Sequence, residues 1–306
     1  MSKSVALVGG ESLLGADLRD HLAPLKPEVR VTLVGSDESP LLTGEGGEAM
    51  VMTGVDEESL AGAAVVVLAG SAASSRRAFE ILEKRRQPVT IIDATAALEE
   101  MPDARIRAPQ VEPRNVPYSR IQVVAHPGAI LLARLMVAAR NVKSAVAVIL
   151  APASERGRPG VDELQQQTVQ LLGFHAIETS VFGQQAAFNL LAGVLDGAER
   201  LIERHTASLL GPFAKPLPSI RLIQAPVMHG YSACLWLDGI GDLDRDGIDL
   251  WPEQAPTPVG VAGESGISIG AIERDRNHPS AVWMWAVADQ FRLSAANVVQ
   301  LVRAAL

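Results

Sequence analysis

Short apolar runs separated by helical patterns fill the first 125 residues of the chain. Four leucines between positions 13 and 22 recur at about the 3.6-residue period of a helix, and residues 76–85 predict a second helix. The run at 64–68 is fully apolar, which is typical of a parallel strand buried on both faces. Strands that alternate with helices indicate an α/β domain with a Rossmann-type, doubly wound parallel sheet. The predicted strands are residues 5–8, 31–34, 64–68, 89–92 and 121–125.

From about residue 145 the pattern becomes that of an α+β domain with a mixed or antiparallel sheet. A loop is predicted at 156–160, and Ser294 is the expected N-cap of an amphipathic helix that closes the chain. The predicted strands are residues 145–150, 220–227, 231–237, 267–274 and 281–288, and the predicted helices are residues 161–172, 187–209 and 294–306.

The 306 residues leave room for two packed domains. We expect residues 1–126 to form a dinucleotide-binding-like domain that a C-terminal helix at 292–306 completes. Residues 127–291 are then an α+β domain of the dimerisation or substrate type. The net charge of −8, without a basic stripe, argues against a nucleic-acid partner.

No feature of the chain predicts a membrane span or an exported protein. No run of about 18 apolar residues occurs, and the N-terminal residues lead directly into a strand without the pattern of a signal peptide. The chain has one cysteine, Cys234, so no internal disulfide is expected. We therefore expect a cytoplasmic protein that does not contact membranes.

The turn between the first strand and the first helix carries the candidate cofactor-binding residues. A Rossmann-type fold rests a dinucleotide pyrophosphate on this turn and on the N–H groups of the helix. Ser12 replaces the middle glycine of a G-x-x-G-x-x-G pattern and partly blocks a phosphate, and Glu11 adds a negative charge. The alternative interpretation is a turn that holds no ligand. The candidate residues are Gly9, Ser12, Leu13 and Gly15.

Two carboxylates follow the second predicted strand, at Asp37 and Glu38. A site that prefers NADP favours an arginine in this region, because the 2′-phosphate is an anion. The two carboxylates would repel that phosphate. If the chain binds NAD(P) at all, NAD is therefore expected over NADP.

Six stretches together resemble the aspartate-semialdehyde dehydrogenase family, and they run in the family's order from the first strand to the last helix. The resemblance implies the two-domain fold, a role in amino-acid biosynthesis, an NADPH cofactor and a homodimer formed through the second domain. The stretches are residues 5–9 with Gly15, 92–97, 160–168, 187–190, 225–232 and 283–306.

The resemblance also implies a reaction, the reductive dephosphorylation of β-aspartyl phosphate. The family uses a cysteine thiolate as nucleophile, a histidine as acid–base group and two arginines that hold the substrate's anionic groups. In this chain other residues stand at all four positions. Cys234 lies in a distant strand pattern and is expected to be a small buried hydrophobe. The cysteine, histidine, substrate-arginine and phosphate-arginine positions are held by Ala129, Tyr231, Gln224 and Glu99.

Two functions remain open from the sequence. The first is a non-catalytic relative that acts by binding itself, an active paralogue or another protein. The second is an NAD(P)-dependent oxidoreductase with an altered mechanism, in which Tyr231 or His229 serves as the acid. His229 lies two residues from the family's histidine position, and a structural histidine is the other interpretation.

Two further patterns have alternative interpretations. The strand at 281–288 is apolar and aromatic, so it predicts either a dimer interface or intramolecular core. Residues 242–253 fit the spacing of a calcium loop, although Pro252 and a preceding strand are atypical, and an acidic surface turn is the alternative. The candidate calcium ligands are Asp242, Asp244, Asp246 and Glu253.

Overall fold

A computed structural model describes residues 3–25, 28–36, 41–45, 48–85, 89–113 and 115–306. The chain divides into two compact units, one of residues 1–126 with 294–306 and one of residues 127–293. Among the described residues, none of the helices has both the length and the apolar character needed to cross a lipid bilayer.

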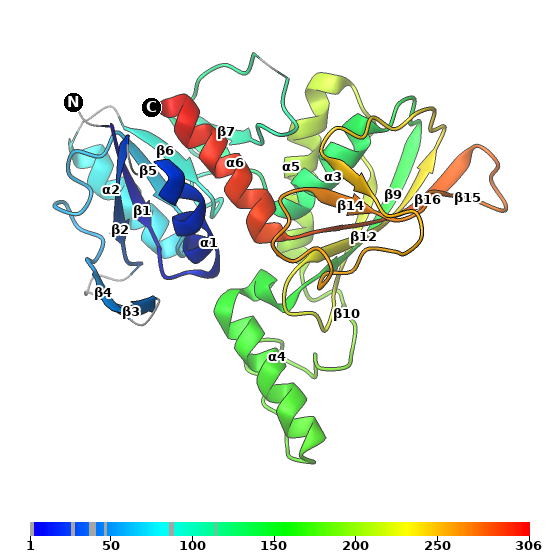
Figure 1. Ribbon diagram of the computed structural model, residues 1–306, viewed down its shortest axis with the longest axis horizontal. Coiled ribbons are helices and arrows are strands. Elements are labelled where there is room, and N and C mark those ends of the chain that lie inside the picture. Colours follow the sequence, from blue (N-terminus) through cyan, green and yellow to red (C-terminus); the bar gives the residue numbers. More distant parts are fainter. Residues whose placement is uncertain (1–2, 26–27, 37–40, 46–47, 86–88, 114) are drawn as a thin grey trace. The chain divides into compact units, whose positions relative to one another are not determined.

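The first unit is built on a six-stranded parallel sheet in the order β2-β1-β5-β6-β8-β7 (Figure 1). The order reverses at β1, because the chain moves from β2 on one side of it to β5 on the other. The predicted parallel α/β fold is confirmed. The elements are β1 (Lys3–Val8), α1 (Leu13–Leu22), β2 (Val29–Val34), β3 (Leu41–Glu45), β4 (Glu48–Met52), β5 (Val65–Leu68), α2 (Ala72–Arg85), β6 (Thr90–Asp93), β7 (Ala104–Arg107) and β8 (Ile121–Val124).

Apolar clusters cover both faces of this sheet. On one face, Val5 and Leu7 of β1 pack with Leu18 of α1 and with Val298 and Val302 of the C-terminal helix α6 (Gln290–Ala305). The opposite face packs against α2. Every side chain of β5 is buried, as the apolar run at 64–68 predicts. The strands are therefore held with their carboxyl ends at one edge, where the glycine turn lies.

The second unit has a mixed eight-stranded sheet in the order β10-β11-β9-β12-β16-β14-β13, with β15 paired to β16. The β9–β11 and β13–β14 pairs are parallel and the other pairs are antiparallel. The elements are α3 (Pro127–Ala138), β9 (Ser144–Ala151), η2 (Ala153–Arg156), α4 (Gly157–Leu172), β10 (Leu191–Ala192), α5 (Asp196–Leu210), η3 (Gly211–Phe213), β11 (Ser219–Gln224), β12 (Tyr231–Asp238), β13 (Ile248–Leu250), β14 (Ile267–Ile269), β15 (Glu273–Arg274) and β16 (Ala281–Ala288). A short 3-10 turn of the first unit, η1 (Ala23–Leu25), follows α1.

Four predicted helix starts are wrong, and the first is that of α2, which begins at Ala72 rather than 76. The helix expected at 187–209 begins only at Asp196, because Phe188 and Gly193 have positive φ angles and β10 intervenes. Helix α4 begins at Gly157 rather than 161, since a proline in the first turn is compatible with a helix. Helix α6 begins at Gln290 rather than 294, because the Asp289 carboxylate accepts the N–H groups of Phe291 and Arg292.

The sequence patterns also missed some elements and joined others. The strand predicted at 267–274 is two strands, β14 and β15, separated at Gly270. Helix α3 was not predicted, because nearly all its side chains are apolar and buried, so it lacks an amphipathic period. Strand β7 was missed for the opposite reason, since its sequence Ala-Arg-Ile-Arg has little apolar character.

Candidate functional sites

The glycine turn of the first unit has the backbone geometry of a dinucleotide-binding turn. Gly9 has a φ of +81°, and a Cβ built on it would lie 2.2 Å from the Cα of Gly70. A Cβ on Gly15 would lie 2.0 Å from the carbonyl oxygen of Gly9. The first and third glycines therefore permit the tight turn and the close helix–strand packing that such turns require.

Ser12 and Glu11 are both engaged with the protein itself. The Ser12 hydroxyl accepts the N–H of Gly15 at 2.8 Å and donates to the carbonyl of Ala69 at 2.6 Å. The Ser12 hydroxyl thus caps α1 and is directed into the unit. Its side chain therefore obstructs a phosphate less than we expected from the replacement of glycine by serine. One Glu11 oxygen accepts the N–H of Ser36 at 2.9 Å, and its other oxygen is buried with no hydrogen-bond partner among the described residues.

The residues of this turn suit one part of a dinucleotide better than another. A pyrophosphate suits the N-terminus of α1, which carries a partial positive charge. A 2′-phosphate does not suit the end of β2, because the Glu11 carboxylate already occupies the Ser36 N–H there. Leu13, the remaining candidate, is the first residue of α1. Asp37 and Glu38, from which we predicted a preference for NAD, lie outside the described residues.

The turn after β6 is organised by a buried carboxylate. Asp93 accepts hydrogen bonds from the N–H and hydroxyl of Thr95 and from the N–H of Leu98. Burial raises the pKa of Asp93, and these hydrogen bonds oppose the rise. Glu99, at the family's phosphate-arginine position, is partly exposed and follows this turn directly. The turn is therefore well formed, but it presents a carboxylate where an anion would have to bind.

The residues that the sequence resemblance places at the family's cysteine and histidine positions, Ala129 and Tyr231, are both buried. Ala129 lies in the first turn of α3 and is fully buried. Tyr231, at the start of β12, is 1% exposed, and its hydroxyl donates to the Glu155 carboxylate. Burial and then the neighbouring Glu155 carboxylate raise the pKa of the Tyr231 phenol well above its ordinary value. Tyr231 therefore remains protonated and directed toward its own chain.

Gln224, which the sequence resemblance places at the substrate-arginine position, is held by its own chain through its amide nitrogen, whereas its buried amide oxygen has no hydrogen-bond partner among the described residues. It is 1% exposed, and its amide nitrogen donates to the carbonyls of Ala151 at 3.0 Å and Ala225 at 3.2 Å. Nearby, Gln290 accepts the N–H of Gly230 and donates to the Ser154 hydroxyl, both at 2.6 Å. The Gln224 contact joins β11 to β9, and the Tyr231 and Gln290 contacts join η2, the start of β12 and the start of α6. We call Ser154, Glu155, Gln224, Tyr231 and Gln290 the polar cluster.

His229 lies beside the polar cluster but is not a member of it. Its ring is exposed and contacts the Phe291 ring edge-on, with centroids 5.4 Å apart. Partial desolvation lowers its pKa, the Asp289 carboxylate opposes this, and Arg158 adds to the lowering. The contact with Phe291 does not direct the imidazole toward Ala129. Cys234 is partly buried within β12, and burial raises the pKa of its thiol, as expected of a structural cysteine.

The candidate calcium ligands are not brought together. Asp242, Asp244, Asp246 and Glu253 are all exposed, and no cluster of three or more metal-binding side chains occurs among the described residues. Arg134 donates to the carbonyl of Asp246 and lies 3.7 Å from its carboxylate. Directly after Gly247 the chain enters β13, which directs it away instead of letting Glu253 return to close a loop.

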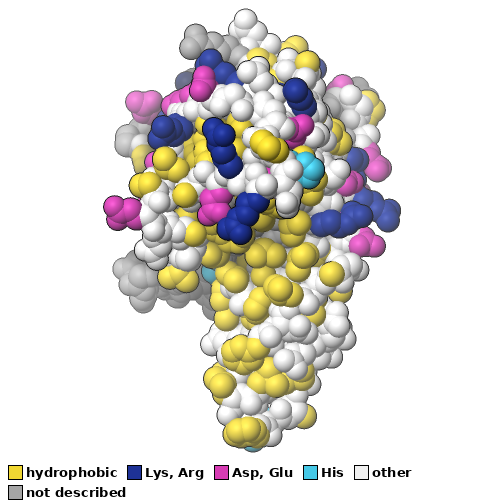
Figure 2. All heavy atoms as spheres, turned by 90° about the vertical axis from the view of Figure 1, so that its right-hand side faces the viewer, with side chains coloured by type: hydrophobic (Ala, Val, Ile, Leu, Met, Phe, Trp, Pro, Cys, Tyr) yellow, Lys and Arg dark blue, Asp and Glu magenta, His cyan; other side chains and the backbone are white. Residues whose placement is uncertain are grey.

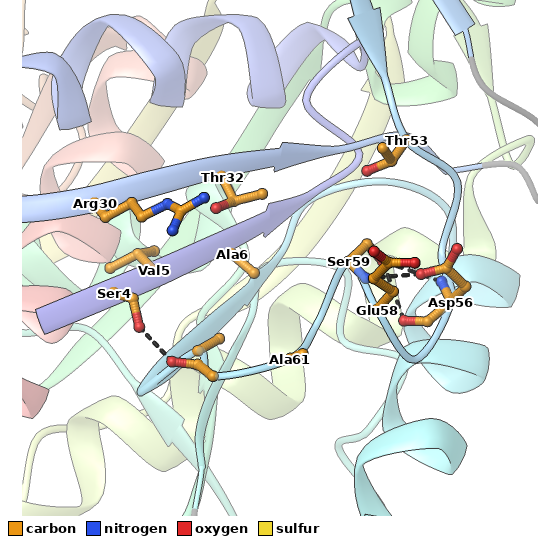
Figure 3. Close-up of a pocket in the computed structure, with 12 residues that line it drawn as sticks. Ser4, Val5, Ala6, Arg30, Thr32, Thr53, Asp56, Glu58, Ser59 and Ala61 are labelled. Atoms are coloured by element: carbon orange, nitrogen blue, oxygen red, sulfur yellow. Dashed lines mark hydrogen bonds between the residues drawn. The ribbon is translucent and has the colours of Figure 1, made fainter. Parts of the chain in front are cut away.

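Neither of two open cavities lies at the glycine turn or at the polar cluster. A cavity of about 470 Å³ lies against β1 and β2 in the first unit, with Arg30 at one side and Asp56 and Glu58 at the other (Figure 3). A cavity of about 550 Å³ in the second unit is lined by Asp242, Arg245 and several apolar side chains. Among the described residues, neither of these two cavities is lined by Ala129, Gln224 or Tyr231.

Sequence reasoning missed Glu155 and Gln290, the partners that close the polar cluster. Glu155 lies between the predicted strand at 145–150 and the predicted loop at 156–160, and Gln290 lies outside the predicted C-terminal helix. The sequence signal for this contact was the Glu155 carboxylate close to the end of a strand. Its partner Tyr231 is 76 positions away in the chain, so the contact could not be predicted from it. Only the sheet register brings them together.

The two units define the class of protein: a dinucleotide-type α/β unit joined to a mixed-sheet α+β unit. No protein-family model matches the chain. The USG-1 protein homolog of Pseudomonas aeruginosa is 30% identical over 335 aligned positions, with 97% of this chain and 96% of that protein covered. Aspartate-semialdehyde dehydrogenase 2 of Vibrio cholerae is 27% identical and covers 70% of this chain and 71% of its own length.

A solved structure agrees with these relatives. The structure of a probable aspartate-semialdehyde dehydrogenase from Pseudomonas aeruginosa superposes with a TM-score of 0.82 at 27% identity, covering 99% of this chain and 98% of that chain. The chain belongs to the aspartate-semialdehyde dehydrogenase family. The family resemblance drawn from the sequence is confirmed.

Proposed function

We propose that this chain is a non-catalytic member of its family that acts by binding. The observation that carries the proposal is the state of the three family positions in the second unit. Ala129, Gln224 and Tyr231 are each at most 1% exposed, and the two polar side chains hydrogen-bond within their own chain. A substrate would find neither a nucleophile nor an arginine there, and good positioning alone does not replace a nucleophile.

The alternative, an NAD(P)-dependent oxidoreductase with an altered mechanism, has less support. Tyr231 is buried with a raised pKa, and its hydroxyl already donates a hydrogen bond to the Glu155 carboxylate. His229 is exposed and packs on Phe291. A general acid must reach the group that it protonates, and neither side chain lines either of the two cavities described above.

Genetic complementation tests the non-catalytic role. The chain is expressed in a bacterial strain that lacks aspartate-semialdehyde dehydrogenase and requires the downstream amino acids. We expect no growth on minimal medium, because the alanine at position 129 cannot form the covalent intermediate. The Vibrio cholerae relative serves as the positive control. Growth equal to that control, with the chain as the sole source of the activity, contradicts the proposal.

We also infer a homodimer formed through the second sheet. Side chains that alternate along β9, β12 and β16 share one face, because Trp236 is paired with both Val146 and Trp283. Val146 and Trp283 are each 43% exposed despite their apolar character. Figure 2 shows hydrophobic side chains gathered on this side of the second unit and along α4 below it. A contiguous apolar face of this kind supports self-association about a twofold axis.

Substitution on this face tests the dimer. Trp283→Arg places a charge at the centre of the proposed interface, so we expect the mass in sedimentation equilibrium to fall from about twice the chain mass to once. The control is Val259→Arg, which is 87% exposed and lies outside the sheet. A wild-type chain that is monomeric, or a Trp283→Arg chain that remains dimeric, contradicts the inference.

A cytoplasmic location remains a prediction from the sequence.

A further inference from the structure

We propose that the glycine turn binds an adenine dinucleotide that lacks a 2′-phosphate, and that Glu11 is the residue that selects it. This inference names the ligand class of the proposed binding function, and it rests on that function. The family resemblance implies NADPH, so the proposal is a departure from the family. It comes from the contact that the Glu11 side chain makes at the end of β2.

The location of the Glu11 carboxylate is the first step. Strands β1 and β2 are parallel and end together, with Val8 paired to Val34. Glu11 follows β1 and reaches across to the residues that follow β2, where its carboxylate accepts the N–H of Ser36 at 2.9 Å. In Rossmann-type folds the adenosine ribose lies at the end of this second strand. An acidic side chain there accepts the ribose 2′-hydroxyl of NAD. Glu11 supplies such a carboxylate from the glycine turn.

The second step is the oxygen that remains. Glu11 Oε2 is buried and has no hydrogen-bond partner among the described residues, while Oε1 holds the Ser36 N–H. A buried carboxylate oxygen without a donor is unfavourable, so it favours a ligand that brings a hydroxyl donor. A ribose 2′-hydroxyl is such a donor. A 2′-phosphate at neutral pH brings negative charge and oxygen acceptors instead, so it is repelled.

The rest of the turn is compatible with a pyrophosphate. Gly9 and Gly15 hold the backbone close to β5 and to the start of α1, and the Ser12 hydroxyl is directed to Gly15 and Ala69. The first turn of α1 contains no acidic residue. The partial positive charge of the helix N-terminus is therefore not neutralised by its own first turn.

Calorimetric titration of the full chain with NAD+ and NADP+ tests the proposal. We expect NAD+ to bind at least about tenfold more tightly than NADP+, and the ratio to shrink at high salt because charge repulsion is screened. Glu11→Gln removes the charge at constant size, so the affinity for NADP+ should rise toward that for NAD+. Glu11→Ala is the second variant, and melting curves without nucleotide confirm that each variant is folded. Asp20→Asn, an exposed carboxylate on α1, is the matched control and should leave the ratio unchanged.

Three results overturn the proposal. The first is NADP+ binding as tightly as NAD+. The second is a Glu11→Gln chain that is folded and keeps the original ratio, since the selection then lies elsewhere. The third is a wild-type chain that binds neither nucleotide. The third result would not contradict the non-catalytic proposal. Turnover of aspartate semialdehyde would contradict the non-catalytic proposal, but it would not contradict the proposal that Glu11 selects the nucleotide.

Discussion

The glycine turn of the first unit and the polar cluster of the second have diverged in different ways. In the turn, the backbone keeps the geometry that close approach demands, at Gly9 and Gly15, and only side chains have changed. In the polar cluster, Gln224 and Tyr231, which we propose stand at the family's arginine and histidine positions, are buried and donate hydrogen bonds within their own chain. A binding turn persists through its backbone, whereas a reactive site depends on particular side chains.

The difference follows from what each function needs. A pyrophosphate is held mainly by backbone N–H groups, so the glycines matter more than their neighbours. Acyl transfer needs a nucleophile, an acid–base group and anion-binding arginines, and each is a side-chain property. Once those side chains are replaced, the buried polar groups left behind need hydrogen-bond partners. Glu155 provides one for Tyr231.

The largest expected effect tests the backbone side of the comparison. Gly9→Ala places a Cβ 2.2 Å from Gly70 at a φ of +81°, so it should destabilise the chain by about 3 kcal/mol or more. Gly62→Ala is the matched control, with a φ of +71° and no atom within 4 Å of the added Cβ. It should cost only about 1 kcal/mol. Urea unfolding measures both, and equal losses would show that the contact with Gly70 is unimportant.

The next largest effect tests the side-chain contacts of the polar cluster. Tyr231→Phe removes the hydroxyl that the Glu155 carboxylate accepts inside the protein, which should cost about 1–3 kcal/mol of unfolding free energy. Tyr118→Phe is the control, because Tyr118 is 70% exposed although its hydroxyl contacts Thr90. Its loss should be about 0.5 kcal/mol or less. If the two variants unfold at the same urea concentration, the polar cluster is not part of the stable core.

A comparable effect extends the comparison to a buried carboxylate of α4. Burial raises the pKa of Glu163, but hydrogen bonds from the N–H groups of Val181 and Phe182 and from Ser180 outweigh it, so the pKa is lowered. A folded-state pKa below the unfolded value gives stability that is present above about pH 4.5 and is lost as the pH falls through the folded-state pKa. Glu163→Gln should cost about 1–2 kcal/mol at pH 7.

The pH series gives this prediction its sharpest form. The difference between wild type and Glu163→Gln should shrink as the pH falls below about 4.5, because the wild-type carboxylate is then protonated as well. Asp162→Asn, the exposed neighbour in the same helix, is the control and should change little. A difference that stays constant from pH 7 to pH 3 is incompatible with hydrogen bonds to the ionised Glu163.

The smallest effect concerns His229. Partial desolvation lowers its pKa, so an NMR titration should place its midpoint below the ordinary value of 6.5. Because the folded-state pKa is lowered, the associated stability is present above pH 6.5 and is lost as the pH falls through the folded-state pKa. His229→Gln identifies the resonance. A midpoint above 6.5 would instead indicate that the Asp289 carboxylate dominates the environment of the ring.

The core of the fold could be predicted from the sequence, because short apolar runs along the chain indicate its strands. The apolar run at 64–68 predicts β5, and residues 281–288 match β16 without error. In the aromatic strand Met284 is buried, as expected of intramolecular core, whereas Trp283 is exposed, and the dimer interface stays a prediction. Boundaries failed where side-chain caps decide them, as at Asp289. No local pattern could predict α3, which is apolar on every face.

The candidate sites were predictable in part. The replacements at Ala129 and Tyr231 are readable from the sequence once the family resemblance is recognised. The contacts that close the cluster are not, because they join residues far apart in the chain. Glu11 was read only as a repulsive charge, and its hydrogen bond to Ser36 depends on the pairing of β1 with β2.

The most direct test of the central claim is a steady-state assay of the purified chain with L-aspartate semialdehyde, inorganic phosphate and either NAD+ or NADP+. The Vibrio cholerae relative, assayed beside it, defines full activity. We predict no formation of reduced nucleotide above the enzyme-free background, since Ala129 offers no nucleophile. Turnover at about 1 per second or faster, the range of ordinary enzymes, would contradict the account.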